Sequence, residues 1–183
     1  PHPSGGAYFL IGDFTGHGLA STIGAIPVSQ TFTRMTTLGQ SVVEIAIAIN
    51  ALLYTMLPTD RFFSASIGHI NIDGTRVILW QGGLPDVFVQ AWFDRSVSRL
   101  ATKHMALGIL PPEEFESDCA IVELDENDAI YLLTDGIIEA TPMASYSQTS
   151  ECLMLGEETL LTWIGEDLHV SAESLVNKAI ETL

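Results

Sequence analysis

The middle of the chain, from Phe62 to Leu133, is a series of short β-type segments. The clearest turn within it is Asp73-Gly74, which separates the apolar segments 62–72 and 77–80. An Asp-Gly pair between two β-type segments is a strong signal for a hairpin, whose strands are antiparallel. Further segments of this character occur at 87–93, 96–100, 120–124 and 129–133. We therefore expect a long antiparallel β region.

Helical patterns lie on both sides of this β region. Residues 41–44 read Ser-Val-Val-Glu, a capping-box pattern placed ahead of apolar residues at helical spacing. Similar patterns occur at 19–32, 157–164 and 171–183, the last with Ser171 as its expected cap. A short apolar strand at 7–11 precedes them all. The order strand, two helices, antiparallel strands, helices predicts an α+β fold with helices packed on an antiparallel sheet.

The composition is that of one compact domain. The chain has 183 residues, of which 47% are hydrophobic and 16% charged. At roughly 150 residues per domain, this length predicts a single domain over residues 1–183. Seven Lys and Arg stand against 23 Asp and Glu, a net charge of −16. A polyanion would be repelled, so we expect no nucleic-acid partner.

Two further features concern membranes and cysteines. The most apolar stretch, 42–57, contains Glu44 and Asn50 and is shorter than the roughly 20 apolar residues that cross a bilayer, so we expect no membrane segment. Cys119 and Cys152 have no close CxxC spacing, so neither a disulfide framework nor a thiolate zinc site is indicated. These features fit a cytoplasmic protein.

Two apolar strands each lead into an aspartate. The strand at 7–11 continues through Gly12 to Asp13, and the strand at 129–133 continues through Thr134 to Asp135. Two carboxylates that meet at the rim of a sheet repel each other unless one is protonated or a cation bridges them. Mg²⁺ and Mn²⁺ prefer such oxygen ligands. The alternative for each aspartate is a simple turn, the commoner role of an Asp at the end of a strand.

The segments around both aspartates resemble a known family. Residues 11–18 read Ile-Gly-Asp-Phe-Thr-Gly-His-Gly, and residues 131–140 read Tyr-Leu-Leu-Thr-Asp-Gly-Ile-Ile-Glu-Ala. They look like the two internal signature motifs of the PP2C-type (PPM) metal-dependent phosphatases, in the same order. The SpoIIE/RsbU branch, often the output domain of bacterial response regulators, is the closer match. The resemblance implies an α-β-β-α sandwich of two antiparallel sheets flanked by helices.

The resemblance also implies an activity and the residues that carry it. The family removes phosphate from serine or threonine of proteins, commonly from a STAS-type anti-sigma factor antagonist in partner switching. Asp13 and Asp135 would be the catalytic residues. Asp13 would bridge two Mn²⁺ or Mg²⁺ ions, the backbone carbonyl of Phe14 would add a ligand, and Asp135 would hold one ion. Gly16 and His17 would contact the substrate, and the alternative for His17 is a role in fixing the turn.

The sequence departs from the family pattern in three places. The family has a Gly-Gly-Asp motif on the strand that precedes this chain's first strand, and an Asp-Asp pair on a strand near the C-terminal end. Neither occurs here, and Gly5-Gly6 is followed by Ala7. Residues 81–85 read Gln-Gly-Gly-Leu-Pro, where related sequences often have Asn-Ala-Gly-His-Pro. Two of the usual metal carboxylates are therefore missing, and we expect a domain that is truncated at both ends.

These features leave three interpretations of function. The leading one is a metal-dependent serine/threonine phosphatase domain of a bacterial signalling protein. The second is a catalytically silent PP2C-like module that binds its partner without turnover. The third is a Mg²⁺ phosphohydrolase that acts on small phosphates. Besides the phosphorylated STAS protein, the expected partners are a receiver or other regulatory domain in the parent chain and a second copy, because the helix at 45–57 is apolar on most sides.

Overall fold

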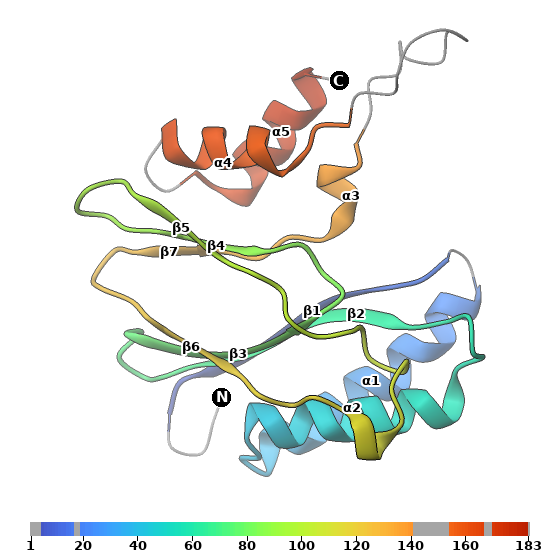
Figure 1. Cartoon of the computed structure of the whole chain (residues 1–183). Helices are drawn as coiled ribbons and strands as arrows, with labels where there is room; N and C mark the ends of the chain where they lie inside the picture. The colour runs from blue at the N-terminus through green and yellow to red at the C-terminus, as the bar shows by residue number, and fades with distance from the viewer. Residues whose placement is uncertain (1–4, 17–18, 141–153, 167–169, 183) are drawn as a thin grey trace, which may run out of the picture. The chain divides into compact units, whose positions relative to one another are not determined.

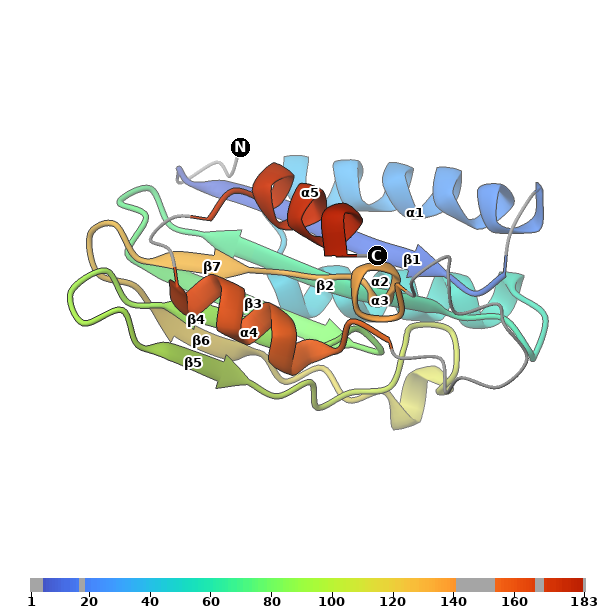
Figure 2. The ribbon, with the colours of Figure 1, turned by 90° about the horizontal axis from the view of Figure 1, so that it is seen from above.

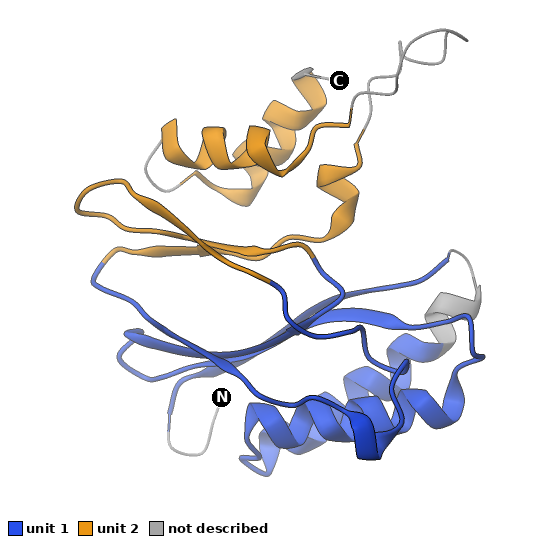
Figure 3. Cartoon of the chain, viewed as in Figure 1, with its two compact units in different colours: residues 1–84, 102–126 blue, residues 85–101, 127–183 orange. Residues whose placement is uncertain are grey.

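The computed structural model describes four stretches of the chain (Figure 1), which are residues 5–16, 19–140, 154–166 and 170–182. The chain forms two compact units, and Figure 3 shows them in different colours. The first unit comprises residues 1–84 and 102–126, and the second comprises residues 85–101 and 127–183. The chain therefore passes between the units after residues 84, 101 and 126. The single domain over residues 1–183 stays a prediction.

The first unit is built on a four-stranded sheet with the strand order β1–β2–β3–β6. Its strands are β1 (Ala7–Phe14), β2 (Phe63–Ile70), β3 (Arg76–Gly82) and β6 (Ala120–Glu123), and all neighbours are antiparallel. The predicted hairpin at Asp73-Gly74 joins β2 to β3. Gly74 takes a φ of +72° in this turn. The Asn71 carboxamide oxygen accepts hydrogen bonds from the backbone N–H groups of Thr75 and Arg76, at 2.9 and 3.0 Å.

Two long helices, α1 (Leu19–Thr37) and α2 (Val42–Met56), contact this sheet (Figure 2). The predicted capping box at the start of α2 is confirmed. Ser41 Oγ accepts a hydrogen bond from the Glu44 N–H at 3.2 Å, and Glu44 Oε2 accepts one from the Ser41 N–H at 2.8 Å. These bonds satisfy backbone donors that a helix start otherwise leaves unpaired.

Helix α1 continues to Thr37, beyond the predicted end at residue 32. Met35 extends the apolar face of the helix, because it packs against the core. The chain turns away from the helix at Gly39, which has a φ of +71°. The Gly39 N–H donates to the Thr36 carbonyl and the Gln40 N–H donates to the Met35 carbonyl, both at 3.1 Å. This is a Schellman motif, which favours glycine at the left-handed position.

The core of the first unit lies between the two helices and the sheet. Its fully buried side chains come from α2, β2, β3 and the segment before η1 (Pro112–Glu114), and include Ile45, Ala46, Ile49, Leu53, Ala65, Ile67, Trp80 and Leu107. Asn50 is also fully buried. Its side chain donates to the Leu110 carbonyl at 3.0 Å and accepts from the Gly108 N–H at 2.9 Å. The apolar character of α2 is thus explained by the sheet that it covers.

The second unit has a three-stranded antiparallel sheet with the order β5–β4–β7. Its elements are β4 (Val87–Gln90), β5 (Val97–Leu100), β7 (Ala129–Tyr131), α3 (Asp135–Ile138), α4 (Glu157–Glu166) and α5 (Ala172–Thr182). Phe88 of β4 packs with residues of α4 and α5, which are Leu160, Trp163, Ile164, Leu175 and Ala179. Gln90 Nε2 donates to the Ile164 carbonyl at 2.6 Å. The predicted cap of α5 is confirmed, since the Ser174 N–H donates to Ser171 Oγ at 3.0 Å.

The fold is therefore α+β, with two antiparallel sheets and helices, as predicted. The apolar strands at 7–11 and 129–133 are only partly buried, and among the described strands β1 and β7 lie at the edges of their sheets. Ile11 of β1, for example, is 36% exposed. Within the described ranges, no helix combines the length and the apolar character that crossing a bilayer requires.

Candidate functional site

Asp13 lies near the end of β1, directly opposite Ser64 of β2. Leu10 and Phe14 of β1 pack against the helices, so the alternation of side chains places Asp13 on the other face of the sheet. The Asp13 residue is exposed. Gly12 beside it leaves room for Phe63, because a Cβ at this position would lie 2.3 Å from the Phe63 ring. The sequence thus places a solvent-accessible carboxylate at the rim of a sheet.

Phe14, the second expected ligand residue, is held between β2 and α1. Its ring stacks on Phe63, with centroids 4.2 Å apart and the rings 25° from parallel. On α1 it lies against Gly24, where a Cβ would be 2.5 Å from the Phe14 ring. The packing of this ring therefore fixes the backbone that carries the expected carbonyl ligand.

The loop that follows β1 is fixed by the residues that precede β2. The Thr15 N–H donates to the Phe62 carbonyl at 3.1 Å, and the Phe62 N–H donates to Thr15 Oγ1 at 3.0 Å. Arg61 Nη1 donates to the Thr15 carbonyl at 2.9 Å. Gly16 follows with a φ of +83°. His17 lies outside the described residues, so its contact with a substrate stays a prediction, as does that of Gly16.

Two buried serines of β2, which the motifs did not predict, belong to the same face as Asp13. Ser64 is 9% exposed and Ser66 is 1% exposed. Gly83, with a φ of +75°, packs on Ser64, because a Cβ there would lie 2.6 Å from the serine oxygen. Ser66 pairs with Gln81 across the sheet, and its hydroxyl has no hydrogen-bond partner among the described residues. The signal in the sequence was polar residues alternating with apolar ones in a strand.

The 81–85 turn, where the sequence departs from the family pattern, is ordered by hydrogen bonds. Gln81 Nε2 donates to Thr102 Oγ1 at 2.8 Å, and Thr102 Oγ1 donates to the Leu84 carbonyl at 2.7 Å. The Gly83 N–H donates to the His104 carbonyl at 3.2 Å. Through Gly83 and Ser64, this turn lies at the same end of the sheet as Asp13.

Asp135 belongs to the second unit. It is exposed and is the first residue of α3, with Thr134 as the N-cap. Its backbone carbonyl accepts a hydrogen bond from the Glu139 N–H at 2.8 Å. Asp13, Phe14 and Gly16 thus come together in one loop, whereas the sharing of a metal site by Asp13 and Asp135 stays a prediction. Among the described residues, no three His, Cys, Asp or Glu side chains form a potential metal-binding group.

The donors around Asp13 suit a hard divalent cation. They are a carboxylate, a main-chain carbonyl and the hydroxyl of Ser64, all of them oxygen atoms. Mg²⁺ and Mn²⁺ select oxygen donors, whereas zinc sites use thiolate and imidazole groups. The chemistry of the donor set therefore fits the metals that the motifs imply.

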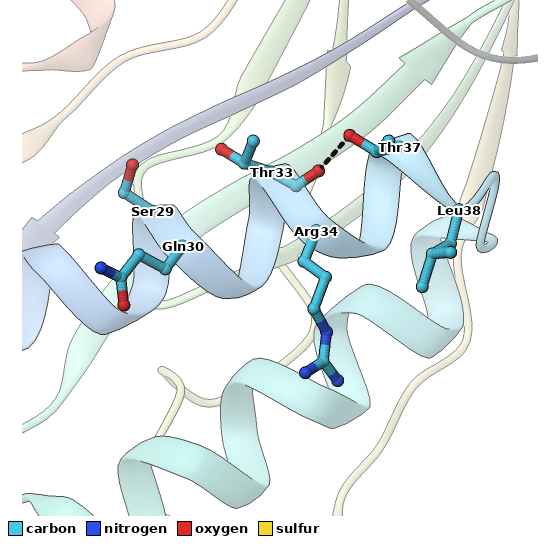
Figure 4. Close-up of a pocket in the computed structure, with 6 residues that line it drawn as sticks. All are labelled: Ser29, Gln30, Thr33, Arg34, Thr37 and Leu38. Carbon is cyan, nitrogen blue, oxygen red and sulfur yellow. Dashed lines mark hydrogen bonds between the residues drawn. The ribbon is translucent and has the colours of Figure 1, made fainter.

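Two hollows of the first unit involve α1. One, of about 350 Å³, lies at the end of β1 and has a mainly apolar lining, which includes Leu10, Phe14, Val28, Phe32 and Phe63. The other, of about 420 Å³, runs along α1 (Figure 4) and is lined by Ser29, Gln30, Thr33, Arg34, Thr37 and Leu38. Thr37 Oγ1 donates to the Thr33 carbonyl at 2.7 Å in this second hollow. Neither lining contains a carboxylate, so neither hollow offers the predicted metal ligands.

Comparisons with known proteins concern the family and the fold of this chain. A family model described as stage II sporulation protein E (SpoIIE) matches residues 3–183. No curated protein sequence matches significantly. Solved structures share the fold at low sequence identity, among them the three that follow.

The first is the SiaA PP2C domain of Pseudomonas aeruginosa, with a TM-score of 0.74 and 12% identity over 100% of this chain and 70% of that one. The second is the PP2C phosphatase domain, with a fragment of the regulatory domain, of SpoIIE from Bacillus subtilis. Its TM-score is 0.68 and its identity 16%, over 96% of this chain and 49% of that one. The third is the catalytic domain of the serine/threonine protein phosphatase PstP in complex with two manganese ions. Its TM-score is 0.60 and its identity 14%, over 95% of this chain and 79% of that one. At these identities the likeness establishes the fold.

Proposed function

This chain belongs to the SpoIIE family, and from that membership we propose that it is a metal-dependent protein serine/threonine phosphatase domain of a bacterial signalling protein. Its proposed substrate is a phosphorylated STAS-type anti-sigma factor antagonist in the cytoplasm. The observation that carries the proposal is the end of β1. There Asp13 is exposed at the rim of the sheet, and the packing of Phe14 fixes the adjoining carbonyl group.

The proposed cofactors are two Mn²⁺ or Mg²⁺ ions, held by Asp13, the Phe14 carbonyl and Asp135. The PstP structure, which has the same fold and contains two manganese ions, supports this proposal. When bound, such ions lower the pKa of a water molecule and neutralise charge on the phosphoryl oxygens. The contribution of this chain is to hold these carboxylates in exposed positions. The reaction needs no side-chain nucleophile.

The test replaces each aspartate by its neutral isostere. We expect Asp13→Asn or Asp135→Asn to reduce Mn²⁺-dependent release of phosphate from a phosphorylated STAS protein by at least about 100-fold, since even outer-shell changes cost 10- to 100-fold. The assay uses the full-length parent protein, with residues 1–183 alongside. Asp73→Asn, in the exposed β2–β3 turn, is the matched control and should keep full activity. Retained turnover in either of the first two variants would refute the assignment.

A catalytically silent binding module is the second candidate. The observation that favours it is that residues 1–183 contain neither the Gly-Gly-Asp motif nor the Asp-Asp pair of the family. The same assay separates the two, because a silent module binds the phosphorylated protein and releases no phosphate. Hydrolysis of p-nitrophenyl phosphate but not of the phosphoprotein would instead indicate a phosphohydrolase of small substrates.

The proposed regulatory partners are a receiver or other regulatory domain of the parent chain and a second copy. Their support is a group of exposed apolar side chains on the two helices of the first unit. Ile26 of α1 is 59% exposed, and Ile47 and Tyr54 of α2 are 41% and 45% exposed. Burial of such side chains is a usual source of stability in protein association.

A further inference from the structure

Arg61 places a guanidinium group directly against the loop that follows Asp13. Its Nη1 donates to the Thr15 carbonyl at 2.9 Å. Its backbone N–H donates to the Pro58 carbonyl at 2.9 Å, and the next residue, Phe62, is hydrogen-bonded to Thr15. The antiparallel pairing of β1 with β2, in which Phe14 lies opposite Phe63, brings these segments together. Both ends of the Arg61 side chain are therefore fixed relative to the loop.

Gly16 makes this position possible. A Cβ on Gly16 would lie only 1.8 Å from Arg61 Nη1. The guanidinium thus packs across a residue that has no side chain. Gly16 belongs to the 11–18 segment that resembles the family motif. Any larger residue would displace the guanidinium from the loop.

The guanidinium keeps most of its hydrogen-bonding capacity. A guanidinium has five N–H groups, and within the described residues only the bond to Thr15 uses one of them. Its ion pair with Asp60 is weak, because the carboxylate is 3.8 Å from Nε and the Asp60 side chain is 81% exposed. The Arg61 side chain is itself 37% exposed. Its remaining N–H groups are therefore accessible to a ligand.

We propose that Arg61 binds the phosphoryl group of the substrate, a phosphoserine or phosphothreonine side chain of a protein. The inference rests on the proposed function and adds a residue that the motifs do not contain. Arginine matches phosphate because its planar fork donates two parallel hydrogen bonds to two phosphate oxygens. A fixed positive charge is needed here, because the chain has a net charge of −16 and Asp13 itself repels a phosphate dianion. Arg61 offsets that repulsion at the loop where the reaction takes place.

The test measures binding of inorganic phosphate, the reaction product, to the full-length protein by isothermal titration calorimetry in Mg²⁺. Arg61→Gln should raise the dissociation constant about 10- to 100-fold, the range for loss of a charge-assisted hydrogen bond. The dissociation constant of Arg61→Lys should lie between those of the wild type and Arg61→Gln, because lysine keeps the charge but lacks the planar fork of N–H groups. Arg76→Gln is the matched control, since the exposed Arg76 pairs with the exposed Glu123 on neighbouring strands of the same unit, and it should bind phosphate like the wild type.

A second pair of variants tests the geometry with Arg61 retained. Gly16→Ala should weaken phosphate binding as much as Arg61→Gln. The double variant, Gly16→Ala with Arg61→Gln, should bind phosphate no more weakly than either single variant. Gly74→Ala controls for backbone strain, because Gly74 has a φ of +72° and a Cβ at this position would have no atom within 4 Å. Gly74→Ala should leave phosphate binding unchanged.

The outcomes separate this inference from the proposed function. Wild-type phosphate binding in Arg61→Gln would overturn the inference, even if the protein is a phosphatase. Equal loss of Mg²⁺ affinity in Arg61→Gln would also overturn it, because Arg61 would then act only by holding the loop. In a phosphatase, the KM for the phosphoprotein should rise with the phosphate dissociation constant. If no turnover occurs in any variant but phosphate binding depends on Arg61, the inference stands and the proposed function fails.

Discussion

Burial sets the chemistry of several single side chains in this protein. Burial, with a smaller effect of the Asp118 carboxylate, raises the pKa of the Cys119 thiol from 9.0 to about 11. Burial also raises the pKa of Tyr8, with a further contribution from Glu44, and the pKa of Tyr131. The folded protein therefore holds these three acids in their neutral forms at a pH where the unfolded chain begins to ionise.

This difference predicts that the free energy of unfolding falls in alkaline solution. For Cys119 the folded pKa lies above the unfolded one, so its contribution is complete below about pH 9 and is lost as the pH rises towards 11. Urea unfolding at pH 8 and at pH 10.5 measures the fall. Cys119→Ala removes one of the three groups and should make the fall smaller. If the free energy of unfolding falls equally between these two pH values in the variant and in the wild type, the raised pKa of Cys119 is contradicted.

At the scale of single residues, the sequence singled out Asp13, whose role stays a prediction, but not Arg61 or Ser66. Asp13 was recognisable because it lies at the end of an apolar strand within a short local motif. Arg61 reaches the loop only because β1 pairs with β2. Arg61 and Thr15, which its hydrogen bond joins, are 46 positions apart in the chain. Ser66 is unusual only because it is 1% exposed without a partner among the described residues. The position of Arg61 and the burial of Ser66 both depend on tertiary packing.

At the scale of elements, α1 and the end of β1 are linked by Gly24 and Phe14. Gly24→Ala should destabilise the protein, because a Cβ there would lie 2.5 Å from the Phe14 ring. We expect a loss of about 1–3 kcal/mol, the usual cost of overpacking, together with weaker Mn²⁺ binding. Chemical unfolding and metal titration measure the two effects. Gly24→Ala with Phe14→Leu should restore part of the stability, since leucine is smaller than phenylalanine.

The matched control for this substitution lies in α4. A Cβ on Gly165 would be 4.0 Å from its nearest neighbour, Val97. Alanine is favoured over glycine inside a helix by about 0.5–1 kcal/mol, so Gly165→Ala should stabilise the protein. If both glycine variants change stability in the same direction, contact with the Phe14 ring does not decide the effect of Gly24→Ala.

The elements that the sequence predicted well have signals within a few residues. The Ser41 and Glu44 pair predicted the start of α2, and Asp73-Gly74 predicted the hairpin; the structure shows both. Helix α3 was missed because its four residues, Asp135–Ile138, are too few to show a helical period. The sequence did not predict the edge positions of β1 and β7, since strand order depends on pairing between distant segments.

At the scale of the whole molecule, the net charge of −16 affects stability and metal binding together. Close carboxylates repel one another, and this repulsion destabilises the compact state. Sodium chloride should therefore raise the melting temperature gradually, because salt screens the repulsion with a Debye length of about 10 Å at 0.1 M. A specific metal site adds a different effect, which saturates with the concentration of the ion.

The last prediction separates these two effects in the full-length protein. At constant ionic strength, replacement of NaCl by MnCl₂ should stabilise the wild type by about 2.7 kcal/mol when Mn²⁺ reaches 100 times its dissociation constant. Thermal melts over a series of Mn²⁺ concentrations measure this gain. Asp13→Asn and Asp135→Asn should lose the saturable part and keep the response to NaCl, because each removes one negative charge of many. A saturable gain that persists in both variants would mean that Mn²⁺ binds elsewhere on this acidic protein, and the two aspartates would then have only their roles in the turns.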